Sequence, residues 1–324
     1  MVSRLSDTSR YFITSLVMKV FRFGFEAMGG FGEVLIGALS EKQGCVVAKQ
    51  AIDEVARVER KYSRYRSGSI VSRINDSAGS GWVECDEETI SLFGYADALF
   101  ANSDGLFDIT AGILRKAWDF SNPIRPDLQE LRLLIEKIGW DKVERKESSV
   151  RLPIPGMEID FGGFAKEYAA DRAAALLHCA GVRHGYVNLA GDIRVVGPKP
   201  DGEPWLIGIR HPRDPDLLIA SLPLTSGALA TSGDYERYIE IEGNRYCHVL
   251  NPRTGMPVRE WQSVSVSAPL AVHAGSCTTI AMLKESEALP FLETSAMTFL
   301  AVDRFGVVHR KSGEAETSTV NIEP

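Results

Sequence analysis

The sequence predicts an α+β fold, a single large domain in which peripheral helices surround mixed β-sheets. In the second half of the chain, short strand-like stretches lie between Gly, Pro and Asp residues. Elsewhere, apolar residues recur about every 3.6 positions, which predicts helices. No repeat or linker divides the chain, so we expect one domain over residues 21–312. We expect the N-terminal extension, residues 1–20, to be disordered and the polar tail, residues 313–324, to be frayed.

The composition limits the class of protein. The chain has 324 residues, of which 44% are hydrophobic and 24% charged, as in an ordinary globular protein with a sizeable core. The net charge of −7 and the lack of a basic run give no reason to expect nucleic-acid binding. The five cysteines are scattered without a C-x-x-C pair, which argues against a disulfide framework or a zinc site and fits a reducing compartment.

The N-terminus only weakly resembles an export signal. Residues 11–18 are apolar after two arginines, but Thr14 and Ser15 interrupt them and no cleavage site or lipobox cysteine follows. No stretch approaches the ~20 apolar residues of a membrane span. We therefore expect a cytoplasmic protein that is not integral to a membrane, with the periplasmic face as the alternative. The run is also consistent with an upstream extension before an internal start at Met18.

The first half of the chain is expected to begin with two strands and continue with three helices. Gly29 and Gly30 separate the strands, and the third helix has Leu128, Leu131 and Leu134 on one stripe. The expected strands are residues 21–28 and 33–39, and the expected helices are residues 46–65, 87–102 and 126–138.

A junction near the middle is predicted to carry chemistry. A short strand, residues 157–160, would deliver Asp160 to the turn Gly162–Gly163, after which a helix begins near Ala165. Glycines at a helix N-terminus suit an anion because free N–H groups and the helix dipole point the same way, and Lys166 would add positive charge. The spacing is neither that of a Rossmann nor of a P-loop motif. Taken alone, the glycine pair is better explained by close packing between helix and strand.

The second half is expected to be rich in strands. It includes a helix over residues 274–285 and a closing hairpin over residues 297–310. The other expected strands are residues 186–189, 193–196, 205–209, 217–222 and 264–267.

Residues 230–255 are predicted to form a hairpin that carries polar groups. A small-polar turn over residues 231–234 precedes two alternating runs, residues 235–240 and 245–250, joined at Gly243. His248 lies on the second run, ahead of a turn that contains Asn251 and Arg253. The alternative is a surface hairpin with a solvated histidine. Together with the Gly162–Gly163 junction, these hydroxyls, cations and backbone N–H groups indicate an enzyme or binder of a phosphate-bearing ligand.

Several ordered motifs extend this interpretation. They are AMG at 27–29, SRYRSGS at 63–69, DGLFDIT at 104–110, IDFGGFAK at 159–166, VNLAGDI at 187–193 and the stretch 230–255. With these motifs the chain resembles the ApbE family of FAD:protein FMN transferases from about residue 25 to the closing hairpin. The resemblance implies that FAD binds with magnesium and that a threonine of an acceptor flavoprotein attacks the FMN-side phosphorus, so that AMP leaves. Some members of the family hydrolyse FAD to FMN and AMP instead.

The resemblance also assigns site residues. It places His248 at the catalytic histidine, and an imidazole with a pKa near ~6.5 suits removal of a hydroxyl proton at neutral pH. Tyr65 and Phe107 could stack on an aromatic ring of FAD, although core packing would explain both equally well. The residues that fall where family members contact FAD are Met28, Tyr65, Leu106, Phe107, Asp108, Asp160, Lys166 and Val249.

The chain departs from the family pattern at three positions, and the first departure puts the metal site in question. Gly275 stands where the pattern has an aspartate ligand, which leaves the Gly163 carbonyl, Thr278 and Thr279 as neutral ligands. Magnesium prefers carboxylate oxygen, so we expect a weakened or rebuilt site. Glu167 replaces the usual glycine after the lysine, and Asn251 replaces an aspartate.

Four readings follow from the resemblance and its departures. The chain is a working flavin transferase, an FAD pyrophosphatase, a non-catalytic FAD-binding carrier, sensor or subunit, or a member that has lost flavin altogether. We favour the first because His248, Asp160 and Lys166 are retained.

Overall fold

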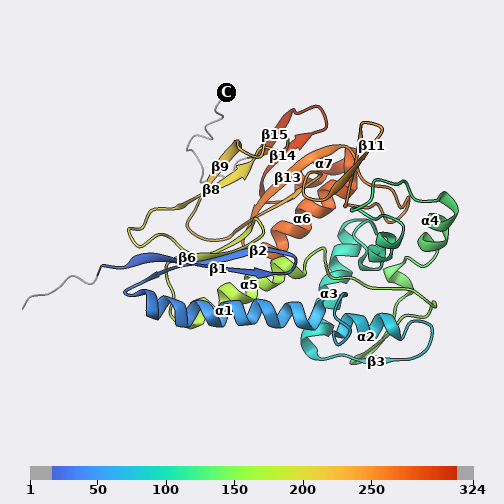
Figure 1. The fold of residues 1–324 in the computed structure, drawn as a ribbon, viewed down its shortest axis with the longest axis horizontal. Helices are drawn as coiled ribbons and strands as arrows, with labels where there is room; N and C mark the ends of the chain where they lie inside the picture. The colour runs from blue at the N-terminus through green and yellow to red at the C-terminus, as the bar shows by residue number, and fades with distance from the viewer. Residues whose placement is uncertain (1–16, 312–324) are drawn as a thin grey trace, which may run out of the picture.

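An eight-stranded antiparallel sheet runs through the molecule, and a computed structural model describes it over residues 17–311 (Figure 1). Its strands lie in the order β1-β2-β6-β7-β10-β13-β14-β15. Their bounds are Lys19–Ala27, Gly30–Ala38, Gly185–Leu189, Asp192–Gly197, Ala228–Gly233, Trp261–Ala268, Thr298–Asp303 and Val308–Lys311. Three smaller sheets are β3 (Val83–Glu84), β5 (Ser149–Arg151) and β4 (Glu144–Lys146); β8 (Trp205–Arg210) and β9 (Leu218–Leu224); and β11 (Tyr238–Ile241) and β12 (Asn244–Cys247).

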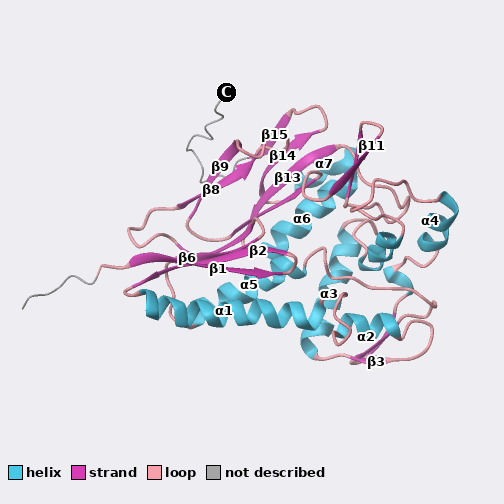
Figure 2. Cartoon of the chain, viewed as in Figure 1, coloured by secondary structure: helices cyan, strands magenta, loops and turns pink. Residues whose placement is uncertain are grey.

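Helices cover one face of the sheet and extend beyond one end of it (Figure 2). In both ribbon views α1 and α5 lie along the first strands, and α6 runs beside β13. None of the helices within residues 17–311 is long and apolar enough to cross a membrane. The helices are α1 (Glu41–Tyr62), α2 (Ile70–Asp76), α3 (Glu87–Asn102), α4 (Leu128–Ile135), α5 (Ala165–Cys179), α6 (Ala271–Lys284) and α7 (Ala288–Thr294).

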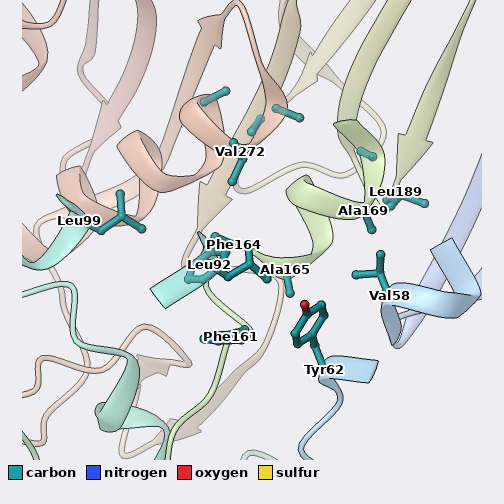
Figure 3. Packing of buried hydrophobic residues seen from close by; sticks show 14 of the residues in the cluster. Val58, Tyr62, Leu92, Leu99, Phe161, Phe164, Ala165, Ala169, Leu189 and Val272 are labelled. Carbon is teal, nitrogen blue, oxygen red and sulfur yellow. The ribbon is translucent and has the colours of Figure 1, made fainter. Parts of the chain in front are cut away.

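The two faces of the sheet support separate cores because successive strand residues point to opposite sides. On β2, Val34 and Ile36 join the large core under the helices, whereas Leu35 joins a second core closed by β8 and β9. Phe161 and Phe164 are fully buried in the large core, with Tyr62 beside Phe161 (Figure 3). The chain therefore fixes the start of α5 firmly against the helices around it.

Trp118 packs against the hairpin of β11 and β12 and holds it in place. This side chain is 1% exposed, donates a hydrogen bond from Nε1 to the Gly255 carbonyl over 2.8 Å, and stacks on Tyr246 with ring centroids 5.6 Å apart. Tyr246 is the penultimate residue of β12, two positions before His248. The position of the histidine thus depends on an aromatic stack.

The predicted α+β fold with a single large domain is confirmed. The helix predicted over residues 87–102 has the same bounds as α3. Residues 1–16 and 312–324 lie outside the described residues, so the predicted tail and most of the predicted extension are not described. Within the extension, β1 begins already at Lys19. The apolar run at 11–18 also falls almost entirely outside the described part of the chain.

Two local predictions are wrong for identifiable reasons. Residues 157–160 form no strand: Ile159 N–H donates to the side chain of Asn75 and Asp160 N–H to the Ile109 carbonyl, so no ladder exists. Thr231 and Ser232 belong to β10 rather than to a turn, because they pair with Ser265 and Val264 of β13.

Other elements were shorter or longer than their pattern suggested. The first helix begins at Glu41, five residues earlier than expected, because Ser40 caps it by accepting from Gln43 N–H. The two seven-residue helices, α2 and α7, went unpredicted because two turns are too short for a clear apolar period.

Replacing Trp118 with alanine should lower the free energy of unfolding by about 3–5 kcal/mol, the usual cost of removing a fully buried aromatic side chain. Urea denaturation of the wild type and of Trp118→Ala measures this. The control is Phe305→Ala, because Phe305 is 77% exposed and its loss should change stability little. Equal stability of Trp118→Ala and wild type would contradict the anchoring role.

Candidate active site

A single cavity of about 930 Å³ gathers the residues that the sequence singled out. Segments distant in sequence form its walls: the β1–β2 turn, the segment after α1, the start of α5, the end of β10 and the loop after β12. The predicted residues that line it are Met28, Tyr65, Leu106, Phe107, Asp108, Asp160, Gly163, Lys166, His248, Val249 and Thr279.

Thr278 is fully buried and is not among the residues that line this cavity. Its hydroxyl donates to the Gly275 carbonyl over 2.8 Å and lies 2.8 Å from Ser232 Oγ. Ser232 does line the cavity, and its Oγ is 3.3 Å from Thr279 Oγ1. Thr278 therefore supports a pair of hydroxyls at the cavity wall rather than lining the wall itself.

Met28 enters the cavity from a tight turn between β1 and β2. Its φ is 54°, in the left-handed region that non-glycine residues rarely adopt, and Gly29 follows with φ 77°. Consecutive left-handed residues are typical of a two-residue hairpin turn, which the pairing of Ala27 with Gly30 requires. The turn projects Met28 toward the ligand space.

Cations surround the cavity, as a phosphate ligand requires. Arg64, Arg115 and Arg237 line it together with Lys166, whose Nζ lies 2.6 Å from Asp192 Oδ2. Burial opposes the charge on Lys166, but Asp192 and Glu167 outweigh it, so the pKa of Lys166 is raised. Guanidinium and ammonium groups are suited to binding a pyrophosphate.

The two predicted aspartates have different surroundings. Asp160 accepts from Gly162 N–H over 2.8 Å and lies 3.4 Å from Arg64 Nη1, which fixes its orientation at the wall. Asp108 is occupied by three donors: Thr110 N–H at 2.7 Å, Thr110 Oγ1 at 2.6 Å and Trp140 N–H at 3.0 Å. Burial raises the pKa of Asp108. Its carboxylate thus holds the cavity wall together.

The aromatic residues divide between the two interpretations offered by the sequence. Phe107 is 5% exposed and packs near Phe164, and a Cβ at Gly163 would lie only 2.8 Å from its ring. Close packing therefore explains both Phe107 and the glycine at 163. Tyr65 is 77% exposed, and its hydroxyl accepts from Arg115 Nη1 over 3.2 Å. Its ring remains free to stack on a ligand.

His248 lies just after β12 with its ring held by the backbone. The backbone N–H of His248 donates to the Arg237 carbonyl over 3.0 Å, and the ring atom Nδ1 lies 3.3 Å from the same oxygen. Burial, and then the charges of Arg115, Arg237 and Lys166, lower the pKa of His248 to about 4, below the ~6.5 expected from the sequence. The imidazole is therefore neutral at neutral pH. With Nδ1–H donating to the carbonyl, Nε2 is available to accept a proton.

Glu167 is a cavity residue whose role the sequence did not assign. It is 7% exposed, and its Oε2 has no hydrogen-bond partner. Burial, and then the Asp192 carboxylate, raise the pKa of Glu167 to about 8. The only signal for it in the sequence was its occurrence, together with Gly275, among the departures from the family pattern.

The residues present are suited to magnesium without forming a preassembled cage. Within residues 17–311 no group of three or more His, Cys, Asp and Glu side chains is arranged to hold a metal ion. The wall does offer hard oxygen donors in the unpartnered Glu167 carboxyl and the hydroxyls of Ser232 and Thr279. Magnesium typically takes one or two carboxylates and completes its shell with water and substrate phosphates. The donor set fits that pattern.

The chain is similar in sequence to a known protein family and to several of its members. A family model described as the ApbE family matches residues 28–301. The chain belongs to the ApbE family. An FAD:protein FMN transferase of Klebsiella pneumoniae (strain 342) is 32% identical over 240 residues, which cover 72% of this chain and 74% of that protein.

Solved structures of the family share the fold. The ApbE protein of Thermotoga maritima superposes with a TM-score of 0.82 at 32% identity, covering 91% of this chain and 97% of that one. The flavinyl transferase ApbE of Pseudomonas stutzeri, in its apo form, gives a TM-score of 0.80 at 26% identity, covering 91% and 95%. The family resemblance and the fold class expected from the motifs are thereby confirmed.

The pKa of His248 should be measurable directly in protein without ligand. We expect its NMR signals to titrate near pH 4, and we expect Arg115→Gln to move the midpoint upward because that substitution removes a nearby positive charge. Arg304→Gln serves as control, since Arg304 pairs with Glu260 and does not line the cavity. A midpoint near 6.5 in the wild type would contradict the burial and charge effects described here.

Proposed function

We propose that this protein is an FAD:protein FMN transferase that moves FMN from FAD to a threonine of an acceptor flavoprotein, releases AMP, and depends on magnesium. The observation that carries the proposal is the position of a neutral His248 in a cavity walled by Arg64, Arg115, Arg237 and Lys166. The names of its relatives, FAD:protein FMN transferase and flavinyl transferase, support the same reaction class.

In the proposed reaction His248 acts as the general base. Its Nε2 takes the proton of the threonine hydroxyl as the hydroxyl oxygen bonds to the FMN-side phosphorus of FAD. The bond from that phosphorus to the bridging oxygen breaks, and its electron pair leaves with AMP. The low pKa of His248 ensures that the base form is present at neutral pH, and bound pyrophosphate would offset the cations that lower it.

The other residues bind and orient the substrate. Lys166 and Arg64 can neutralise the pyrophosphate, which gains negative charge on the leaving oxygen in the transition state. Tyr65 offers an exposed ring at the cavity for stacking. Magnesium, when bound beside the pyrophosphate, would stabilise the charge of the leaving group.

Hydrolysis and simple FAD binding are the alternatives. Water in place of the threonine would make the protein an FAD pyrophosphatase, and Gly275 motivates a non-catalytic FAD carrier, sensor or subunit. The transferase, the pyrophosphatase and the non-catalytic protein would all bind FAD in the same cavity. We also propose that the protein is cytoplasmic, in which case the acceptor presents its threonine on that side of the membrane.

Purified protein supplied with FAD, magnesium and a threonine-bearing acceptor should release AMP, and His248→Ala should reduce the rate by about 10²–10⁴-fold, the usual contribution of a general base. Chromatography measures AMP, and mass spectrometry measures FMN on the acceptor. His178→Ala on the exposed face of α5 is the matched control, since His178 does not line the cavity.

The outcomes separate the alternatives. AMP without a modified acceptor supports the pyrophosphatase. FAD that binds without AMP release supports the non-catalytic protein, and protein that stays colourless after FAD addition and desalting has lost flavin. AMP release that His248→Ala leaves unchanged would contradict the role of the histidine.

A further inference from the structure

Glu167 and Gly275 are in direct contact across the interface of α5 and α6. A Cβ added at Gly275 would lie 2.5 Å from Glu167 Oε1, 2.6 Å from its Cγ and 2.7 Å from its Cδ. Real Cβ atoms do not approach other atoms this closely. The glutamate side chain therefore fills the space that any side chain at position 275 would need.

This contact links two of the departures from the family pattern, Glu167 and Gly275, because they lie against each other. The family pattern has an aspartate at position 275 and a glycine at position 167, whereas this chain has Gly275 and Glu167. The Glu167 side chain occupies the space beside Gly275 from the neighbouring helix. Contact between α5 and α6 makes the exchange possible.

The Glu167 carboxyl group is buried without a matching donor. Its residue is 7% exposed, and Oε2 has no hydrogen-bond partner among the described residues. A buried carboxyl oxygen without a partner is costly, and native proteins retain such a group when a ligand or function requires it. Lys166, the adjacent cation, has its Nζ on Asp192 at 2.6 Å instead.

Neutral oxygen donors line the same cavity as this carboxyl group. Thr279 follows Gly275 by one helical turn, so both lie on one face of α6. Thr279 Oγ1 is 3.3 Å from Ser232 Oγ, and both residues line the cavity together with Glu167 and the backbone of Gly163. The group combines one carboxylate with hydroxyls and a carbonyl, which is chemistry suited to a hard divalent cation.

We propose that the carboxylate of Glu167 is the charged ligand of the divalent cation in this protein, supplied from α5 in place of an aspartate on α6. The inference rests on the proposed function, because the cation would act on bound FAD. It differs from simple space filling, since an apolar side chain would fill the same volume without leaving a buried oxygen unpartnered.

The test is a titration of the full-length protein, with FAD bound, by Mn²⁺ as a magnesium substitute. Electron paramagnetic resonance measures free Mn²⁺, and flavin fluorescence verifies that each variant still binds FAD. Glu167→Gln keeps the shape but cannot form the anion that a bound cation would stabilise, and it should weaken Mn²⁺ binding by about 10-fold or more. Glu59→Gln replaces a carboxylate with an amide at a cavity residue on α1 and should change Mn²⁺ affinity less than about twofold.

The reciprocal exchange keeps the proposal falsifiable if Glu167→Gln folds poorly. The double variant Glu167→Gly/Gly275→Asp returns the carboxylate to α6 and should bind Mn²⁺ within a few-fold of wild type. Gly275→Asp alone places two carboxylates in the same space, so it should bind FAD or Mn²⁺ less well than the wild type or the double variant.

Each result separates this inference from the proposed function. Mn²⁺ that binds equally well to the wild type and to Glu167→Gln, or Mn²⁺ that fails to bind the wild type, overturns the role of Glu167 even when AMP is released. Mn²⁺ that binds through Glu167 without AMP release leaves this inference standing and contradicts the transferase.

Discussion

The site depends on how the chain is fixed at the start of α5. Phe161 and Phe164 are fully buried in the large core, so the turn between them has little freedom. The polar residues on either side then face the cavity: Asp160 before the turn, and Lys166 and Glu167 after it. The same short segment supplies apolar anchors and the charges that meet the ligand. Binding groups on a rigidly packed element lose little entropy when they engage a substrate.

Some charged groups in the cavity are paired with each other, whereas other polar groups there have no partner. Lys166 is paired with Asp192, and Asp160 is oriented by Arg64 and by Gly162 N–H. The groups without a hydrogen-bond partner within residues 17–311 include Nε2 of His248 and Oε2 of Glu167. In the reaction proposed above, the first is the base and the second an oxygen ligand. A site built for phosphoryl transfer needs both functions free, while the remaining groups hold their positions.

The sequence predicted the fold class from local signals, and the family resemblance named residues most of which the structure brings to one cavity. The helix over residues 87–102 has a clear apolar period, and the ordered motifs lie on segments that meet at the cavity. Thr231 was misplaced because its strand identity comes from pairing with Ser265, which lies far away in sequence. The pKa of His248 likewise depends on burial and on Arg115, more than a hundred residues before it. Such effects arise from tertiary contacts, which no local pattern encodes.

The contact between Glu167 and Gly275 constrains how this protein can change during evolution. Introducing an aspartate at position 275 first would require the Glu167 side chain to move, because a Cβ there would otherwise lie 2.5 Å from Glu167 Oε1. Removing the glutamate first would leave a pocket with neither carboxylate. If Glu167 is the charged ligand, as proposed above, each single step gives two crowded carboxylates or none, whereas the arrangement at either end keeps one. The pair is therefore epistatic: descendants that inherit it stay with a glutamate on α5, and the two positions are expected to vary together among relatives.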